Sequence, residues 1–353
     1  MPDRGARQAA AHWGDDRRAA FYAEGGLMWG QLAAVQARIN AKISGDPSRD
    51  WIAHLMSTQL PGMWPVERAL SLCCYEGQVE RALARAGVFR HCLGLDISEG
   101  ALRRARQYAA AEGHACIEYA QQDINALTLE PGQYDVVFSR GALHHIAALE
   151  HVLDQIAIGL KPHGILVINE YVGPSRFQSP DRRIEVCNAA LTLLPERYRR
   201  SVSWQRIQRV GPGAHRALGA WLKLAWLKLR NGTLFEALSR RLYHRRLRAR
   251  SEVYVKREVP RIQASEMAVD DPTEAIRSAE IVPLVRERFE ILDQRPYGGT
   301  ILLPVLDDIA GNFGPDDPTA TKLLEMLFEI EDTLMAAGEI DSDFVYLVAR
   351  PKR

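Results

Sequence analysis

Short apolar runs alternate with amphipathic segments through the middle of the chain. Five of these runs have the length and apolar content of buried strands, at residues 69–74, 92–97, 116–120, 134–139 and 165–169. Between them, apolar residues recur at helical spacing over residues 78–86, 98–112 and 149–160. Strands that alternate with helices of this length indicate βαβ units, and therefore a doubly wound, mostly parallel α/β sheet whose ligand binds at the carboxyl ends of the strands.

Outside this block the pattern changes. Residues 1–65 contain helical segments at 31–43 and 51–59, which predicts an N-terminal helical cap. Residues 174–278 are helical in pattern and numerous enough to have a small core of their own. The alternation resumes with a helix at 279–289, a strand at 290–295, a helix at 323–337 and a strand at 344–349. We therefore expect a cap (1–65), a first core segment (66–173), a helical basic insertion (174–278) and a second core segment (279–353).

Charge and cysteine content narrow the class of protein. The net charge is +1, which favours neither nucleic acid nor anionic membranes as partners of the whole chain. Residues 216–261 are an exception, with 13 Lys and Arg against 3 Asp and Glu. Five cysteines without paired zinc-ligand spacing predict neither a disulfide framework nor a metal site, and hence a reducing, cytoplasmic location. We find no signal-peptide pattern at the N-terminus and no apolar run of membrane-spanning length.

Polar or small residues stand where each predicted strand ends. The first strand runs into the tight turn 73–77, and the second ends at Asp96, a carboxylate that can accept both hydroxyls of a ribose. The third is followed by Asp123 and Ile124, which suit the amine and the face of a purine. The fourth ends in the segment 139–145, which contains two adjacent histidines. Four such features, each one βα unit apart, predict a nucleoside-containing ligand.

This pattern resembles the class I S-adenosylmethionine-dependent methyltransferases over residues 66–173. The segments Tyr-Asp-Val-Val-Phe-Ser-Arg-Gly-Ala-Leu-His-His at 134–145 and Leu-Lys-Pro-His-Gly-Ile-Leu at 160–166 look like that family's fourth strand and its approach to the fifth. The resemblance implies a seven-stranded Rossmann-like sheet with an antiparallel last strand, and S-adenosylmethionine as the cofactor. It assigns the following residues to cofactor binding: Cys73, Cys74, Tyr75, Gly77, Asp96, Ile97, Asp123, Ile124, Ser139, Arg140 and Gly141.

One part of the chain departs from the family pattern. The family's turn after the first strand usually reads Gly-x-Gly-x-Gly, whereas here the three glycine positions hold Cys73, Tyr75 and Gly77. Glycine serves such turns because it adopts positive φ and lets a ligand approach the backbone. A nicotinamide cofactor would also suit Asp96, but no Gly-x-Gly-x-x-Gly follows the first strand. We therefore expect S-adenosylmethionine, held by an unusual turn.

The candidate catalytic residues are His144, His145 and Glu170. A histidine at a strand end titrates near neutrality and can take a proton from a hydroxyl or amine nucleophile. The alternatives are that both histidines only pack beneath the following helix, and that the reaction needs only positioning. The segment after the fifth strand leaves the sheet above the expected site, as does the segment after the sixth. From these segments we assign Tyr171, Arg176 and Tyr297 to the acceptor.

The resemblance implies a methyltransferase that acts on an oxygen or nitrogen of a small-molecule, glycan or lipid-type acceptor. The alternative is a methyltransferase-like binding or scaffold protein with an altered cofactor turn. Within the insertion, residues 217–250 combine tryptophans and leucines with a strongly basic stretch, which suits peripheral contact with a membrane. A lid helix with a solvated basic face is the alternative there, and nucleic acid is not expected because no reader motif is present.

Overall fold

The computed structural model describes residues 27–201, 218–250 and 252–352, and its centre is a seven-stranded sheet in the order β3-β2-β1-β4-β5-β7-β6. β1 to β5 are mutually parallel, and β7 is antiparallel to both of its neighbours. The predicted doubly wound sheet with its antiparallel last strand is therefore confirmed. The strands are β1 (Val66–Leu72), β2 (Phe89–Asp96), β3 (Ile117–Gln121), β4 (Tyr134–Arg140), β5 (Leu160–Tyr171), β6 (Phe289–Gly298) and β7 (Phe344–Pro351).

The largest difference from the expected boundaries is at β5. We expected residues 161–164 to form a turn, but the strand already begins at Leu160, which pairs with Tyr134 of β4 across a register shift. An irregular pairing of this kind absorbs extra residues without ending the strand, which the local sequence does not reveal. The carboxyl end of β5 extends to Tyr171, so Glu170 is part of the sheet.

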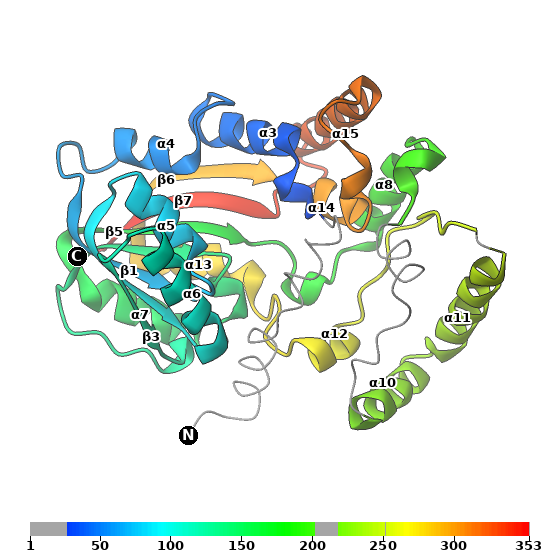
Figure 1. Ribbon diagram of the computed structural model, residues 1–353, viewed down its shortest axis with the longest axis horizontal. Coiled ribbons are helices and arrows are strands. Elements are labelled where there is room, and N and C mark those ends of the chain that lie inside the picture. Colours follow the sequence, from blue (N-terminus) through cyan, green and yellow to red (C-terminus); the bar gives the residue numbers. More distant parts are fainter. Residues whose placement is uncertain (1–26, 202–217, 251, 353) are drawn as a thin grey trace.

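Helices cover both faces of the sheet (Figure 1). On one face α4 (Trp51–Thr58), α5 (Gln78–Arg85) and α6 (Glu99–Ala111) contribute Leu55, Leu83 and Leu102 to one apolar cluster. On the other face α7 (Leu149–Gly159) and α13 (Ile281–Arg288) contribute Leu153 and Val285 to a second cluster. Burial on both faces explains why the central strands read as continuous apolar runs.

A third cluster joins segments from both ends of the chain and from the insertion. It contains Trp29, just before α3 (Ala33–Ser44), and residues of α8 (Asp181–Thr192), α14 (Leu302–Leu306) and α15 (Pro318–Ala336). Val259, near the end of the basic stretch, also packs here. We expected a separate core for the insertion; its described flanks instead share one with the N-terminal and C-terminal helices, because these leave an apolar surface beside the sheet.

The remaining insertion helices are α10 (Leu218–Arg230), α11 (Leu234–Ala249) and α12 (Ala264–Asp270). Figure 1 shows α10 and α11 at the rim of the molecule, away from the sheet, whereas α12 leads back toward it. None of the helices in the described ranges is both long enough and apolar enough to cross a membrane. The parts of the predicted cap and insertion at 1–26 and 202–217 lie outside the described residues.

Candidate active site

The carboxyl ends of four strands meet around one thiol. Cys73 follows β1, and its pKa is raised well above the usual value by burial and by the carboxylates of Asp96, Asp123 and Glu170. These three carboxylates follow or end β2, β3 and β5, so residues almost a hundred positions apart act on a single side chain. The expected convergence of the strand ends is therefore present, and it makes this edge of the sheet a strongly acidic site.

The turn between β1 and α5 keeps the backbone path that glycines would give it. Cys73, Tyr75 and Gly77 all have positive φ, at 51°, 48° and 71°. Such values are uncommon for residues with a Cβ, particularly bulky ones. At Gly77 a Cβ would lie 2.1 Å from the hydroxyl of Tyr119, so only glycine fits there. The alternating left-handed residues are preserved although two of the three glycines are not.

Asp96 connects this turn to β2. The amide of Tyr75 donates to Asp96 Oδ2 over 2.9 Å, and the amide of Ser98 donates to Oδ1 over 2.8 Å. Burial raises the pKa of Asp96, while these amide donors act in the opposite direction. The carboxylate is thus fixed between the two loops where a ribose would lie, with lone pairs still available to accept hydroxyl hydrogens.

The side chains of the turn point in different directions. Cys74 packs into the apolar cluster on the α5 face, so only its backbone faces the strand ends. Tyr75 and Glu76 both interact with the guanidinium of Arg104 on α6. The side chain of Tyr75 is therefore tied to the neighbouring helix. The residues present fit the methionine part of S-adenosylmethionine through backbone atoms of the turn rather than through side chains.

The other predicted cofactor residues occupy two neighbouring loops. Asp123 begins a single turn of 3-10 helix (Ile124–Ala126) and accepts from the amide of Asn125 over 3.0 Å, while Ile124 is buried beside it. Ile97 is half-buried next to Asp96. After β4, Ser139 is buried, Arg140 is exposed, and Gly141 turns the chain with a φ of 60°.

Glu170 organises the loop after β4. It is fully buried; its Oε2 accepts from the amides of Ala142 and Leu143 over 2.7 and 2.8 Å, and its Oε1 accepts from the amide of Tyr171 and from His144 Nδ1. Burial lowers the pKa of His144, but the Glu170 carboxylate and other nearby acids outweigh it, so the net shift is upward. Because Nδ1 of His144 donates to Glu170, its Nε2 points to the other side.

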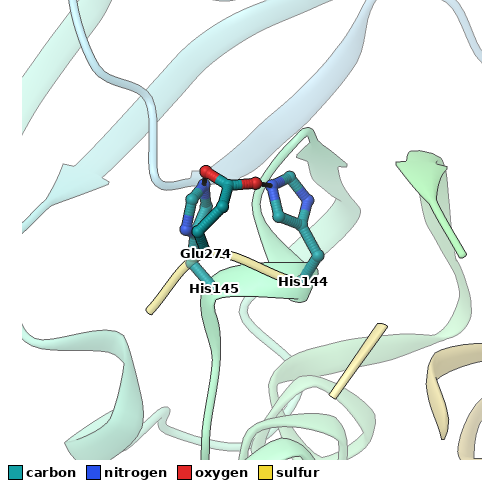
Figure 2. Close-up of side chains that lie close together, drawn as sticks. All are labelled: His144, His145 and Glu274. Carbon is teal, nitrogen blue, oxygen red and sulfur yellow. Dashed lines mark ion pairs between the residues drawn. The ribbon is translucent and has the colours of Figure 1, made fainter. Parts of the chain in front are cut away.

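A distant segment completes this loop. The backbone of Ile276 donates to the carbonyl of His144 over 2.9 Å, and Thr273 Oγ1 lies 3.2 Å from His145 Nδ1. The same segment places the carboxylate of Glu274 between the two imidazoles, as Figure 2 shows. Glu274, Thr273 and Asp271 were missed by sequence reasoning, because they lie more than 120 residues from the histidines in a stretch without a distinctive pattern.

Three residues assigned to the acceptor are engaged by the protein itself. Arg176 donates to the carbonyls of Pro272 and Glu274 over 2.6 and 3.1 Å. Tyr171 donates to the carbonyl of Pro174, and the buried Tyr297 donates to Asn169 Oδ1 over 2.7 Å. Their polar atoms contact backbone and side-chain partners: Arg176 holds the segment that carries Glu274, and Tyr171 packs its ring edge-on to His144.

Comparisons with known proteins agree with this geometry. A family model described as a methyltransferase domain matches residues 70–168. The sterol 24-C-methyltransferase of Clavispora lusitaniae is 27% identical over 150 residues, which is 41% of this chain and 39% of that protein. The 27-O-demethylrifamycin SV methyltransferase of Amycolatopsis mediterranei is 31% identical over 138 residues, 36% of this chain and 50% of that protein.

The chain thus spans half or less of the length of these two relatives. Among solved structures, an S-adenosylmethionine-dependent methyltransferase from Mesorhizobium loti is 17% identical, with a TM-score of 0.41 over 84% of this chain and 96% of that one. The sheet order, the turn after β1 and the family match over 70–168 lead to one assignment. The chain contains a domain of the class I S-adenosylmethionine-dependent methyltransferase family.

Proposed function

We propose that this protein transfers a methyl group from S-adenosylmethionine to an oxygen or nitrogen of a small-molecule acceptor. The observation that carries the proposal is the left-handed turn after β1 joined to Asp96 through the amide of Tyr75. This arrangement holds a carboxylate and a ligand-accessible backbone together at the edge of the sheet. Positive φ at Cys73 and Tyr75 keeps the turn on the backbone path that the family's glycines would give it, which leaves its backbone open to a ligand.

The residues divide into two groups. Asp96 would hold the ribose, Asp123 and Ile124 the adenine, and the turn 73–77 the methionine part. When bound, the cofactor supplies a methyl group on a positively charged sulfur. The surroundings of Cys73 suit that positive charge, because three carboxylates lie close enough to interact electrostatically with the Cys73 side chain.

The second group faces the acceptor. A hydroxyl or amine loses a proton when it is methylated, so a site for oxygen or nitrogen acceptors benefits from a group that removes it. His144 and His145 follow β4 side by side, and Glu170 fixes the first of them through Nδ1. We propose that this pair activates the acceptor. Tyr171 and Arg176 would hold the pair in position, on the side away from the acceptor.

The acceptor class follows from the enclosure of this site. The segment 271–276, docked on the carbonyl of His144 and on Arg176, covers the histidines and leaves their side chains only 12% and 13% exposed. A covered site admits a small molecule more readily than a folded macromolecule. The two relatives named above act, by their names, on a sterol and on a rifamycin, which supports small-molecule, glycan or lipid-type acceptors.

Cofactor binding and turnover test the proposal. We expect S-adenosylhomocysteine to bind with a Kd of about 1–100 μM in calorimetry. Labelled methyl should pass from S-adenosylmethionine to members of a panel of hydroxylated and aminated small molecules. His145→Ala should slow that transfer about 100-fold or more, while the exposed His163→Ala should not.

The same measurements distinguish the alternative, a binding or scaffold protein with an altered cofactor turn. Absence of binding for both S-adenosylmethionine and S-adenosylhomocysteine would favour this alternative and contradict our proposal. Binding without turnover on any acceptor, together with equal affinity in the His145→Ala protein, would also support a binding role.

The insertion presents a surface that suits an anionic membrane. Among the described side chains of α10 and α11, six large apolar ones are exposed, at Trp226, Leu229, Phe235, Leu238, Leu242 and Tyr243. Phe235 is the most exposed of them, at 83%. Exposed basic residues lie on the same helices, at Lys223, Arg230, Arg245, Arg246 and Arg250. Apolar side chains combined with lysine and arginine favour insertion at the interface of an anionic bilayer.

Vesicle co-sedimentation tests this surface. We expect the protein to sediment with vesicles that contain phosphatidylglycerol, less so at high salt, and not with pure phosphatidylcholine vesicles. The double variant Phe235→Glu, Leu242→Glu should lower the bound fraction at least fivefold, because it removes two apolar anchors and adds repulsion. Leu193→Glu is the matched control, since Leu193 is 56% exposed and lies on the end of α8. Equal binding by the double variant would instead favour a lid role.

A further inference from the structure

Three potential metal ligands converge beside the cofactor site. One ligand atom from each of His144, His145 and Glu274 lies within 4.8 Å of the others, a combination found once among the described residues. In Figure 2 the carboxylate of Glu274 stands between the two imidazole rings. The histidines are adjacent in sequence, and the carboxylate is brought to them by the segment 271–276. Two imidazole nitrogens and a carboxylate oxygen form a donor set typical of divalent transition metals.

The orientation of both rings is set by groups on their far sides. His144 Nδ1 donates to Glu170. Thr273 Oγ1 donates to Asp271 Oδ1 over 2.6 Å, so its oxygen is left to accept from His145 Nδ1, 3.2 Å away. Metal-binding histidines almost always have their second ring nitrogen held in this way by a carboxylate, hydroxyl or carbonyl. Nε2 of each ring is therefore left on the side that faces Glu274.

The distances on that side are too long for hydrogen bonds. Nε2 of His144 lies 3.6 Å from one oxygen of Glu274, and Nε2 of His145 lies 4.0 Å from the other. Ligands bound to zinc at about 2.0–2.2 Å are about 3.4 Å apart in a tetrahedral arrangement. The two observed spacings are longer than this and reach different oxygens of Glu274, so a small inward shift of the side chains would complete a site.

The surroundings also have an excess of negative charge. Glu170, Asp271 and Glu274 contribute three carboxylates, and Asp271 Oδ2 is buried without a hydrogen-bond partner in the described part of the chain, 3.8 Å from His145 Nδ1. Arg176 is the nearby guanidinium, and its donors go to backbone carbonyls. A buried, unpaired carboxylate oxygen is costly unless a cation compensates it.

We propose that His144, His145 and Glu274 bind one divalent transition-metal ion of the zinc class, with Glu170, Thr273 and Asp271 orienting the histidines. Three protein ligands leave a position open, as in catalytic zinc sites, and Glu274 is a quarter exposed, which leaves access to it. The sequence had predicted no metal because its cysteine spacing gives none and Glu274 is remote from the histidines.

The role of this ion rests on the proposed methyl transfer. An acceptor hydroxyl that binds at the open position becomes more acidic, so its O–H bond breaks and the proton passes to solvent. The oxygen then forms its bond to the methyl carbon as the carbon–sulfur bond breaks, with the electron pair remaining on sulfur. With the ion bound, the histidine pair activates the acceptor by holding the ion, which takes the place of proton removal by Nε2 itself. The acceptor class narrows to molecules with a metal-binding oxygen.

Zinc calorimetry on the full-length, untagged protein, stripped with EDTA and dialysed, tests the site. We expect one Zn²⁺ per chain and no detectable binding of Mg²⁺, because Mg²⁺ prefers oxygen ligands. His144→Ala and Glu274→Ala should each weaken Zn²⁺ binding at least 100-fold, and Asp271→Asn about 10-fold through the orientation of His145. His163→Ala, an exposed histidine at the start of β5, should bind like wild type.

Thermal melting separates loss of the site from loss of the fold. Zn²⁺ should raise the melting temperature of the wild type but not that of Glu274→Gln, whose own metal-free melting should be close to wild type. Equal Zn²⁺ affinity in wild type and both alanine variants, or equal binding of Zn²⁺ and Mg²⁺, would overturn the proposal. Calorimetry with S-adenosylhomocysteine on the same samples distinguishes failure of the zinc-site proposal from failure of the proposed methyl transfer. Cofactor binding without Zn²⁺ binding would refute the zinc site alone. Absence of cofactor binding would refute the proposed methyl transfer.

Discussion

Replacing Asp96 by alanine is expected to weaken S-adenosylhomocysteine binding about 100-fold. The carboxylate accepts from the amides of Tyr75 and Ser98, so it fixes the turn after β1 as well as offering acceptors to a ribose. Hydrogen bonds to a charged group contribute about 1.5–3 kcal/mol each, and about 2.7 kcal/mol corresponds to a 100-fold change in Kd. Isothermal titration calorimetry measures the change directly.

Two further variants make this result interpretable. Asp96→Asn keeps one acceptor oxygen and the shape of the side chain, so it should fold and lose about 10-fold in affinity. Glu99→Ala removes an acid that is paired with Arg106 on the exposed side of α6, only three residues away, and should bind like wild type. Circular dichroism checks that each variant is folded. Unchanged affinity in both Asp96 variants would show that the ribose is held elsewhere.

Glu80 is expected to make the stability of the protein fall as pH rises from about 4.5 to 7. It lies fully buried on α5, where Ser71 donates to one oxygen and the other has no hydrogen-bond partner among the described residues. Burial raises its pKa from 4.5 to about 7, even though the Ser71 hydrogen bond acts to lower it. The unfolded chain releases this proton at lower pH than the folded chain. The protonated Glu80 therefore adds to the free energy of unfolding below pH 4.5, and this contribution is lost as the pH rises to about 7. The total loss in the free energy of unfolding is about 3 kcal/mol.

Glu80→Gln should remove this pH dependence. Glutamine stays neutral at every pH, so the variant should not lose this stability. Relative to wild type, its free energy of unfolding should therefore be higher at pH 8 than at pH 5, by up to about 3 kcal/mol. Urea denaturation at both pH values measures it. Comparing the two pH values cancels any constant cost of burying the amide. Glu67→Gln, at an exposed position on β1, is the control, and an unchanged difference at both pH values would show that Glu80 is ionised throughout.

Much of the fold was determined by local sequence. The apolar runs from 69 to 169 and the helical spacing between them predicted the first five strands and the order of the helices, because burial on both faces imposes a pattern that each element carries by itself. Strand-end residues such as Asp96, Asp123 and His144 were found for the same reason. In a parallel sheet all carboxyl ends meet at one edge, so position along the chain fixes position in the site.

The tertiary structure decided what depends on contacts between distant segments. The sequence at 73–77 suggested a disrupted turn, but the backbone there keeps left-handed residues because Asp96, on the next strand, holds the amide of Tyr75. The raised pKa of Glu80 depends on which helix face packs on the sheet. Glu274 joins His144 and His145 only because Arg176 and the carbonyl of His144 anchor its segment there. Periodicity reports on a residue's own element, whereas these features arise from contacts between different elements, which no local pattern encodes.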